Sequence, residues 1–137
     1  MSNISHKIIK FPCITDDRGN LTFIEGLNHI PFTINRVYWI FDVPGGALRN
    51  GHAYHTQEEC IIALSGSVDI FIDDGKTSQL VTLDRAYMGL CISKKIWREI
   101  HNFSTNAVVM VLASGPYSKS EYITDKTEFK RIYDQKI

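Results

Sequence analysis

The feature that most constrains the fold is a series of short runs rich in β-branched and aromatic residues, separated by turn signals. Such a series is typical of an all-β sandwich or barrel. Most of the runs have the length of a single strand. We expect strands at residues 7–11, 21–25, 36–41, 59–64, 67–72, 78–83, 88–92, 97–102 and 107–114.

Local patterns strengthen this prediction. The sequence Asp-Asp-Gly-Lys at residues 73–76 separates two runs, and its glycine suits the positive φ of a tight hairpin. In the run before it, Val68, Ile70 and Ile72 alternate with other residues, which predicts one apolar strand face. Only residues 120–133 have helical spacing, with Ser118 or Ser120 as a candidate N-cap.

The length of 137 residues suits one domain. No repeat or linker interrupts the chain, so we expect a single domain over residues 1–137. Lysine plus arginine and aspartate plus glutamate both number 15, so no net charge attracts nucleic acid or an anionic membrane. The longest apolar stretches are far shorter than the ~20 residues of a membrane helix, and residues 1–7 lack a secretory signal. We expect a cytoplasmic location, and we expect the three widely spaced cysteines to be free thiols.

The motif with the clearest chemical content surrounds His52. Gly46, five residues, His52-x-Tyr54, four residues, Glu59, six residues and Gly66 reproduce the spacing of the first cupin motif. Together with the predicted strands and the helical spacing near the C-terminus, this motif favours a jelly-roll barrel with a short C-terminal helix. Residues two apart in a strand share a face, so His52 and Tyr54 would meet a ligand in the barrel together.

A metal-binding cupin is the less favoured alternative. Many cupins use histidine where this chain has Tyr54, although His52 and Glu59 remain as possible ligands. In the second half of the motif the usual histidine position holds Ile100. His101 lies one residue away, which in a strand means the opposite face. The usual ligand set is therefore incomplete.

Cations and aromatic residues near the motif could bind an anionic nucleotide. Arginine suits phosphate because its planar guanidinium donates hydrogen bonds in pairs. Arg36, Arg49 and Arg98 are the arginine candidates, and Tyr38 and Trp97 are the aromatic candidates for stacking. Taken singly, most such residues are surface charges or core aromatics.

Short motifs along the whole chain resemble the dTDP-4-keto-6-deoxyglucose 3,4-ketoisomerases. They begin with Asp-Asp-Arg-Gly-Asn-Leu at residues 16–21 and Ile-Pro-Phe-Thr-Ile-Asn-Arg-Val-Tyr at residues 30–38. The His52 motif follows, and Ile-Trp-Arg-Glu at residues 96–99 and Tyr-Ile-Thr-Asp at residues 122–125 continue the order. The resemblance runs from about residue 7 to residue 129.

This resemblance implies a small cupin that needs neither a metal nor an organic cofactor. It implies a homodimer with exchanged N-terminal strands, acting on a dTDP-linked 4-keto-6-deoxyhexose on the way to 3-amino sugars of surface polysaccharides. The family's two catalytic histidines fall on His52 and Tyr54. Arg98 stands at a position that is usually histidine, and Glu59 stands at a usual glutamine.

Moving a ketone from C4 to C3 requires a base, an enediol and an acid. Histidine has an ordinary pKa near 6.5 and suits the base, so His52 is the expected base. Tyr54 could donate a proton to the enolate oxygen, and Arg98 could stabilise the enediolate or bind pyrophosphate. The alternative is a nucleotide-sugar-binding cupin in which the two substitutions have removed or redirected activity.

Overall fold

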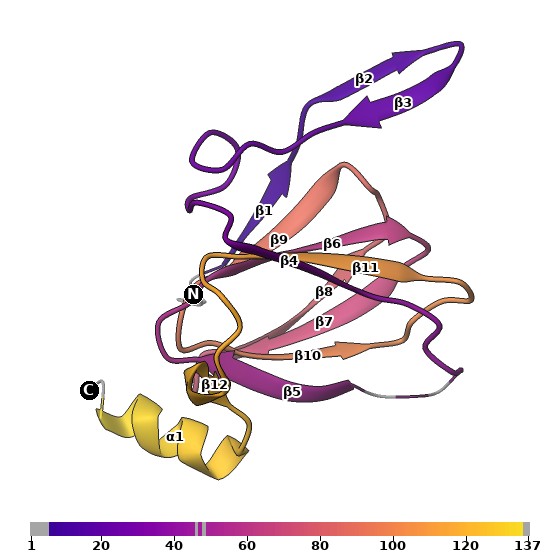
Figure 1. The fold of residues 1–137 in the computed structure, drawn as a ribbon. Coiled ribbons are helices and arrows are strands. Elements are labelled where there is room, and N and C mark those ends of the chain that lie inside the picture. The colour runs from indigo at the N-terminus through magenta and orange to yellow at the C-terminus, as the bar shows by residue number, and fades with distance from the viewer. Residues whose placement is uncertain (1–5, 46, 48, 136–137) are drawn as a thin grey trace.

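The computed structural model describes residues 6–45, 47 and 49–135, and Figure 1 shows their arrangement. Short strands account for nearly all of the regular structure, and one helix follows them. In chain order the elements are β1 (His6–Lys10), β2 (Cys13–Asp16), β3 (Gly19–Thr22), β4 (Arg36–Ile40), β5 (Arg49–Tyr54), β6 (Glu59–Ser65), β7 (Val68–Asp73), β8 (Ser78–Leu83), β9 (Met88–Ile92), β10 (Trp97–His101), β11 (Val108–Ala113), a 3-10 turn (Lys119–Glu121), β12 (Tyr122–Ile123) and α1 (Lys126–Gln135).

Two antiparallel sheets of five strands form the body of the domain. One has the order β1-β9-β6-β11-β4 and the other β12-β5-β10-β7-β8. Apart from the β7–β8 hairpin, neighbours in these two sheets are distant in sequence, as expected for the jelly-roll architecture predicted above. The third sheet is the hairpin of β2 and β3, which projects away from the body in Figure 1. We call this hairpin the arm.

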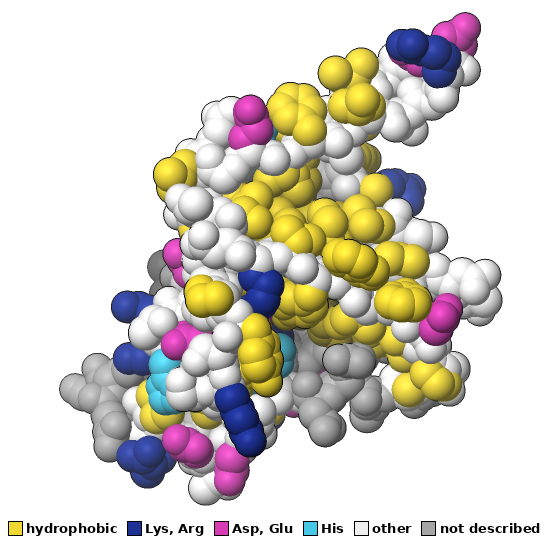
Figure 2. Space-filling view, in the orientation of Figure 1, with side chains coloured by type: hydrophobic (Ala, Val, Ile, Leu, Met, Phe, Trp, Pro, Cys, Tyr) yellow, Lys and Arg dark blue, Asp and Glu magenta, His cyan; other side chains and the backbone are white. Residues whose placement is uncertain are grey.

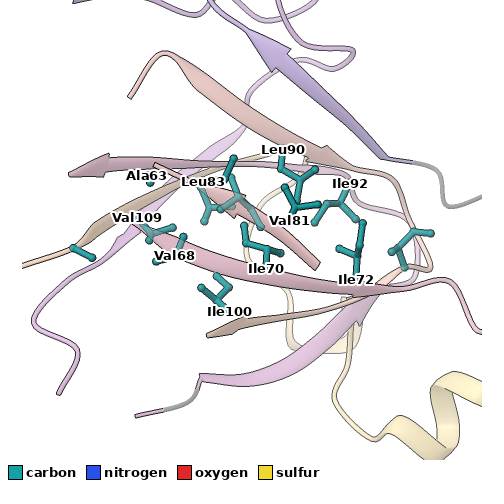
Figure 3. Packing of buried hydrophobic residues seen from close by; sticks show 14 residues of the cluster. Ala63, Val68, Ile70, Ile72, Val81, Leu83, Leu90, Ile92, Ile100 and Val109 are labelled. Atoms are coloured by element: carbon teal, nitrogen blue, oxygen red, sulfur yellow. The ribbon is translucent and has the colours of Figure 1, made fainter. Parts of the chain in front are cut away.

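The main core lies between the two five-stranded sheets. Val68, Ile70 and Ile72 of β7 are each at most 1% exposed, so the apolar face predicted from alternation is confirmed. Leu90 of β9 and Val109 of β11 face them from the other sheet, as Figure 3 shows. Ile61, Ile100 and Val111 of this core also line the polar pocket described below.

The hairpin prediction is also confirmed. Gly75 has φ +97° between β7 and β8, a conformation that favours glycine. The predicted start of the C-terminal helix is wrong. Residues 119–123 form the 3-10 turn and β12, because β12 pairs with β5, and α1 begins only at Lys126. The Asp125 carboxylate accepts the Thr127 backbone N–H at 2.8 Å, so neither predicted serine caps the helix.

The cysteines are free, as expected. Cys60 and Cys91 are buried and stand opposite each other on β6 and β9, while Cys13 is exposed on the arm. Among the described residues, no helix is both long and apolar enough to cross a membrane.

Candidate active site

Strands of both sheets bring polar side chains to one pocket of about 350 Å³. β4 and β6 contribute from the first sheet, and β5, β10 and β12 from the second. His52 stands directly opposite Arg98 across the β5–β10 pairing, so the two share a face. Aliphatic side chains form the rest of the wall. The lining residues are Arg36, Tyr38, Ile40, His52, Glu59, Ile61, Arg98, Ile100, Val111, Tyr117 and Tyr122.

The carboxylate of Glu59 organises the polar wall. Its Oε1 accepts a hydrogen bond from Nη1 of Arg98 at 2.6 Å. Its Oε2 accepts the hydroxyls of Tyr38 at 2.5 Å and Tyr54 at 2.6 Å. Burial alone would raise the pKa of Glu59, but the contact with His52 and the charge of Arg98 lower it to about 2. Glu59 is therefore a permanent buried anion at neutral pH.

Arg98 neutralises this anion from the floor of the pocket. Its side chain is 1% exposed, and its Nη2 donates to the carbonyl of Ile96 at 2.9 Å. Its guanidinium also lies 5.1 Å from the ring centre of Tyr54. A buried charge needs such partners because desolvation is costly. Both terminal nitrogens of the Arg98 guanidinium therefore donate to oxygens of the protein.

His52 faces the pocket with properties that suit a base. Its Nε2 lies 3.9 Å from Oε1 of Glu59, and its side chain is 20% exposed. Burial lowers the pKa of His52 below 6.5, and the charges of Arg98 and Arg36 act in the same direction, while Glu59 opposes them. The imidazole is consequently neutral at pH 7 and can accept a proton.

Tyr54 lies beside His52 but behind the pocket wall. It is fully buried, and its ring centre is 4.9 Å from that of His52. Arg36 donates to its hydroxyl from Nη2 at 3.2 Å, while that hydroxyl donates to Glu59. Burial and then the charge of Glu59 raise the pKa of Tyr54. The shared face of His52 and Tyr54 is confirmed, but Tyr54 is not among the lining residues.

Three buried nitrogens around the pocket have no hydrogen-bond partner among the described residues. They are Nη1 of Arg36, Nε2 of His52 and Nε of Arg98. Leaving such a group unpaired costs about 1–3 kcal/mol, and more if it is charged. Oxygen acceptors of a ligand would satisfy the two arginine nitrogens, and a hydroxyl of the ligand would donate to Nε2 of His52. The arrangement therefore fits a small, oxygen-rich molecule better than an apolar one.

The structure separates some of the predicted site residues. Trp97 packs against Ala53, Ile123 and Phe129 on the outer face of its sheet, away from the pocket. The reason is strand alternation, which places Trp97 and its neighbour Arg98 on opposite faces. Arg49 belongs to β5, but its side chain lies outside the described residues.

The prediction that Ile100 and His101 lie on opposite faces of one strand is confirmed. Ile100 lines the pocket, whereas His101 faces away and bonds to Glu99 at 2.9 Å. Within the described part of the chain, no group of three or more histidine, cysteine, aspartate and glutamate side chains is arranged to hold a metal ion.

Two further tyrosines, Tyr117 and Tyr122, line the pocket and were not predicted from the sequence. Tyr117 lies at the pocket rim and is 69% exposed. Tyr122 lies deeper, with its hydroxyl 3.2 Å from that of Tyr54. The only signal for Tyr122 was its place in the Tyr-Ile-Thr-Asp motif, because nothing local shows that this segment pairs with β5.

The fold and the site define a cupin whose pocket is equipped for acid–base chemistry on a polar ligand. The family model described as FdtA, WxcM-like, C-terminal, matches residues 4–134. A relative from Aneurinibacillus thermoaerophilus, a TDP-4-oxo-6-deoxy-α-D-glucose-3,4-oxoisomerase, is 41% identical over 93% of this chain and 92% of its own. The chain belongs to this family of sugar 3,4-ketoisomerases.

Solved structures agree with this assignment. A TDP-quinovose 3,4-ketoisomerase from Campylobacter jejuni is 42% identical, with a TM-score of 0.89 over 93% of this chain and 98% of that one. A sugar 3,4-ketoisomerase from Thermoanaerobacterium thermosaccharolyticum in complex with TDP is 32% identical, with a TM-score of 0.96 over 99% of both chains. A mutant of the same enzyme is in complex with TDP-4-keto-6-deoxyglucose.

Proposed function

We propose that this protein moves the ketone of a dTDP-linked 4-keto-6-deoxyhexose from C4 to C3. The observation that carries the proposal is His52, a neutral imidazole whose unpartnered Nε2 meets a pocket lined by polar donors. The relatives supply the substrate class, because the A. thermoaerophilus protein is a TDP-sugar oxoisomerase. The 3-keto product would then serve an amination that leads to 3-amino sugars.

The chemistry needs a proton to leave C3, next to the ketone. His52 would take this proton, because its lowered pKa leaves the imidazole uncharged at neutral pH. The negative charge that develops on the C4 oxygen would meet the unpartnered nitrogens of Arg36 and Arg98. His52 would then return a proton to C4, which completes the shift without an oxidant or a reductant.

The predicted role of Tyr54 as acid is less well supported. Its proton is held by a carboxylate that stays ionised at neutral pH, and its side chain is fully buried. These contacts favour a supporting role in which Tyr54 fixes Glu59 and Arg36. The buried ion pair with Glu59 likewise favours a role for Arg98 in neutralising that carboxylate over a role in binding pyrophosphate.

The test is incubation with dTDP-4-keto-6-deoxyglucose in D2O, followed by NMR. We expect a 3-keto product that carries deuterium from the solvent, and we expect His52→Asn to abolish both signals. His55→Asn is the matched control, because His55 follows Tyr54 at the end of β5 and is not among the lining residues. If the unmodified protein binds dTDP but forms no product and exchanges no deuterium, it is a binding protein and the isomerase proposal fails.

We also propose that two copies form a homodimer through the arm. Ile14 and Leu21 of the arm are 57% and 56% exposed, and Phe23, which follows the arm, is 41% exposed. Trp39 and Phe41 near the sheet edge are 59% and 57% exposed. Figure 2 shows apolar side chains gathered on the face below the arm. Exposed apolar surface of this kind marks an interface, and an isolated two-stranded hairpin is marginally stable. A second copy, with its N-terminal strands exchanged, would cover these residues.

A further inference from the structure

Tyr122 enters the pocket next to the proposed base. It stands directly opposite Tyr54 in the β5–β12 pairing, and residues opposite each other share a face of the sheet. Its ring centre is 5.1 Å from that of His52 and 4.8 Å from that of Tyr54. Unlike Tyr54, it lines the pocket. Tyr122 is therefore placed to touch the same part of a ligand as His52.

The hydroxyl proton of Tyr122 is hydrogen-bonded differently from those of Tyr38 and Tyr54. A tyrosine hydroxyl carries a single proton. Tyr38 and Tyr54 both donate theirs to Oε2 of Glu59, and Glu59 remains ionised at neutral pH. Those two protons are therefore held by the protein. Among the described residues, the hydroxyl of Tyr122 meets that of Tyr54 at 3.2 Å and Nη2 of Arg36 at 3.4 Å, so its proton can be given to a ligand.

Arg36 places a positive charge beside the hydroxyl of Tyr122. Its guanidinium is always charged and can only donate hydrogen bonds. It donates to the oxygen of Tyr122, where a negative charge forms when the proton leaves. Its other terminal nitrogen, Nη1, is buried without a partner among the described residues. The cation is thus available to the tyrosine and to a ligand oxygen at once.

The backbone around Tyr122 is held firmly on both sides. Oε1 of Glu121 accepts the backbone N–H of Thr56 at 2.5 Å and that of Gln57 at 2.7 Å. On the other side Ile123 is 1% exposed and packs beneath α1 with Phe129. A catalytic group needs such support to keep its geometry. Glu121 is by this reasoning a positioning residue for Tyr122.

We propose that Tyr122 is the catalytic group that carries a proton between the two sugar oxygens, while His52 carries one between the two carbons. This inference rests on the proposed isomerase function. In the first half, His52 Nε2 takes the C3 proton, the C3–H electron pair forms the C3=C4 bond, and the C4 carbonyl electron pair moves to the oxygen. That oxygen takes the proton of Tyr122, which gives the enediol.

The second half reverses these roles. The phenolate of Tyr122 takes the proton of the C3 hydroxyl, and the electron pair left on that oxygen forms the C3 carbonyl. The C3=C4 electron pair then takes the proton from His52 at C4. Both residues end in their starting states, and all atoms and electrons balance.

The test compares Tyr122→Phe with the unmodified protein on dTDP-4-keto-6-deoxyglucose. The variant keeps the ring and loses only the proton and the oxygen. Loss of one such donor typically lowers kcat by about 10²–10³-fold. We expect that fall in kcat, with an equal fall in deuterium incorporation at carbon, a KM within about twofold, and dTDP binding unchanged by calorimetry. Tyr87→Phe is the matched control, because Tyr87 lies outside the site pocket, and it should leave kcat unchanged.

The outcomes separate the two proposals. An active unmodified protein with a Tyr122→Phe kcat within about threefold would overturn the role of Tyr122 and leave the isomerase function standing. A raised KM with an unchanged kcat would also overturn it, because Tyr122 would then serve binding alone. An unmodified protein that forms no product would overturn the isomerase function and, with it, the role of Tyr122.

Discussion

The buried pair of Glu59 and Arg98 yields the sharpest stability prediction. Replacing Arg98 by methionine keeps much of the side-chain volume and removes the charge. It leaves the carboxylate of Glu59, 1% exposed, without the cation that now lies 2.6 Å away. Breaking a buried ion pair by removing one partner costs about 3–5 kcal/mol. We expect Arg98→Met to lower the free energy of unfolding by this amount.

The expected loss translates into a large change in melting temperature. The entropy of unfolding is about 2.1 cal/mol/K per residue, and the chain has 137 residues. One kcal/mol then corresponds to roughly 3.5 °C, so Arg98→Met should melt about 10–17 °C lower at pH 7. Circular dichroism measures this directly. The matched control is Arg131→Met, which breaks a 3.8 Å ion pair with Glu128 on the surface of α1 and should cost less than about 1 kcal/mol.

The dependence on pH distinguishes lost charge pairing from lost packing. In the unmodified protein the pKa of Glu59 is depressed from 4.5 to about 2. Its stabilising contribution is therefore present above pH 4.5 and is lost only as the pH falls towards 2. Removing Arg98 takes away one of the charges that lower the pKa of Glu59, so we expect Glu59 of the variant to gain its proton at a higher pH than in the unmodified protein. The difference between variant and unmodified protein should shrink towards pH 4.5. A difference that is independent of pH, or a melting change no larger than that of Arg131→Met, would refute this reasoning.

Other predictions concern catalysis and assembly. Because the pKa of His52 is lowered below 6.5, kcat/KM should fall on the acid side with a midpoint below pH 6.5; a midpoint above that value would exclude His52 as the base. His52→Asn should lower kcat by about 10²–10⁴-fold while circular dichroism shows melting within a few degrees of the unmodified protein, and an unchanged kcat would contradict its role. Leu21→Asp places a charge on the apolar arm and should give a monomer by light scattering, whereas Asp17→Asn, a change at the polar arm tip, should leave the mass unchanged. A persistent dimer after Leu21→Asp would remove the arm from the interface.

Local patterns in the sequence were enough to predict much of the fold. Alternation predicted the buried face of β7, and it predicted that Ile100 and His101 face opposite sides of β10, both confirmed. The glycine of the β7–β8 hairpin could be recognised because its φ of +97° favours that residue. The same alternation should have excluded Trp97 from a site that includes Arg98, since neighbours in a strand point apart.

The sequence by itself determined the strand faces, the placement of His52 and Tyr54 on one face, and the family, because periodicity and motif spacing are local properties of the chain. Only the tertiary structure decided the partners. It joined Arg98 to Glu59, and it brought Tyr122 beside Tyr54, which is 68 residues away in the chain. Pairing between distant strands depends on how the sheets assemble, so no local pattern reveals it. These distant pairings give the tyrosines their different roles. Glu59 accepts the hydroxyl protons of Tyr38 and Tyr54, whereas Tyr122 is the tyrosine proposed to give its proton to the substrate.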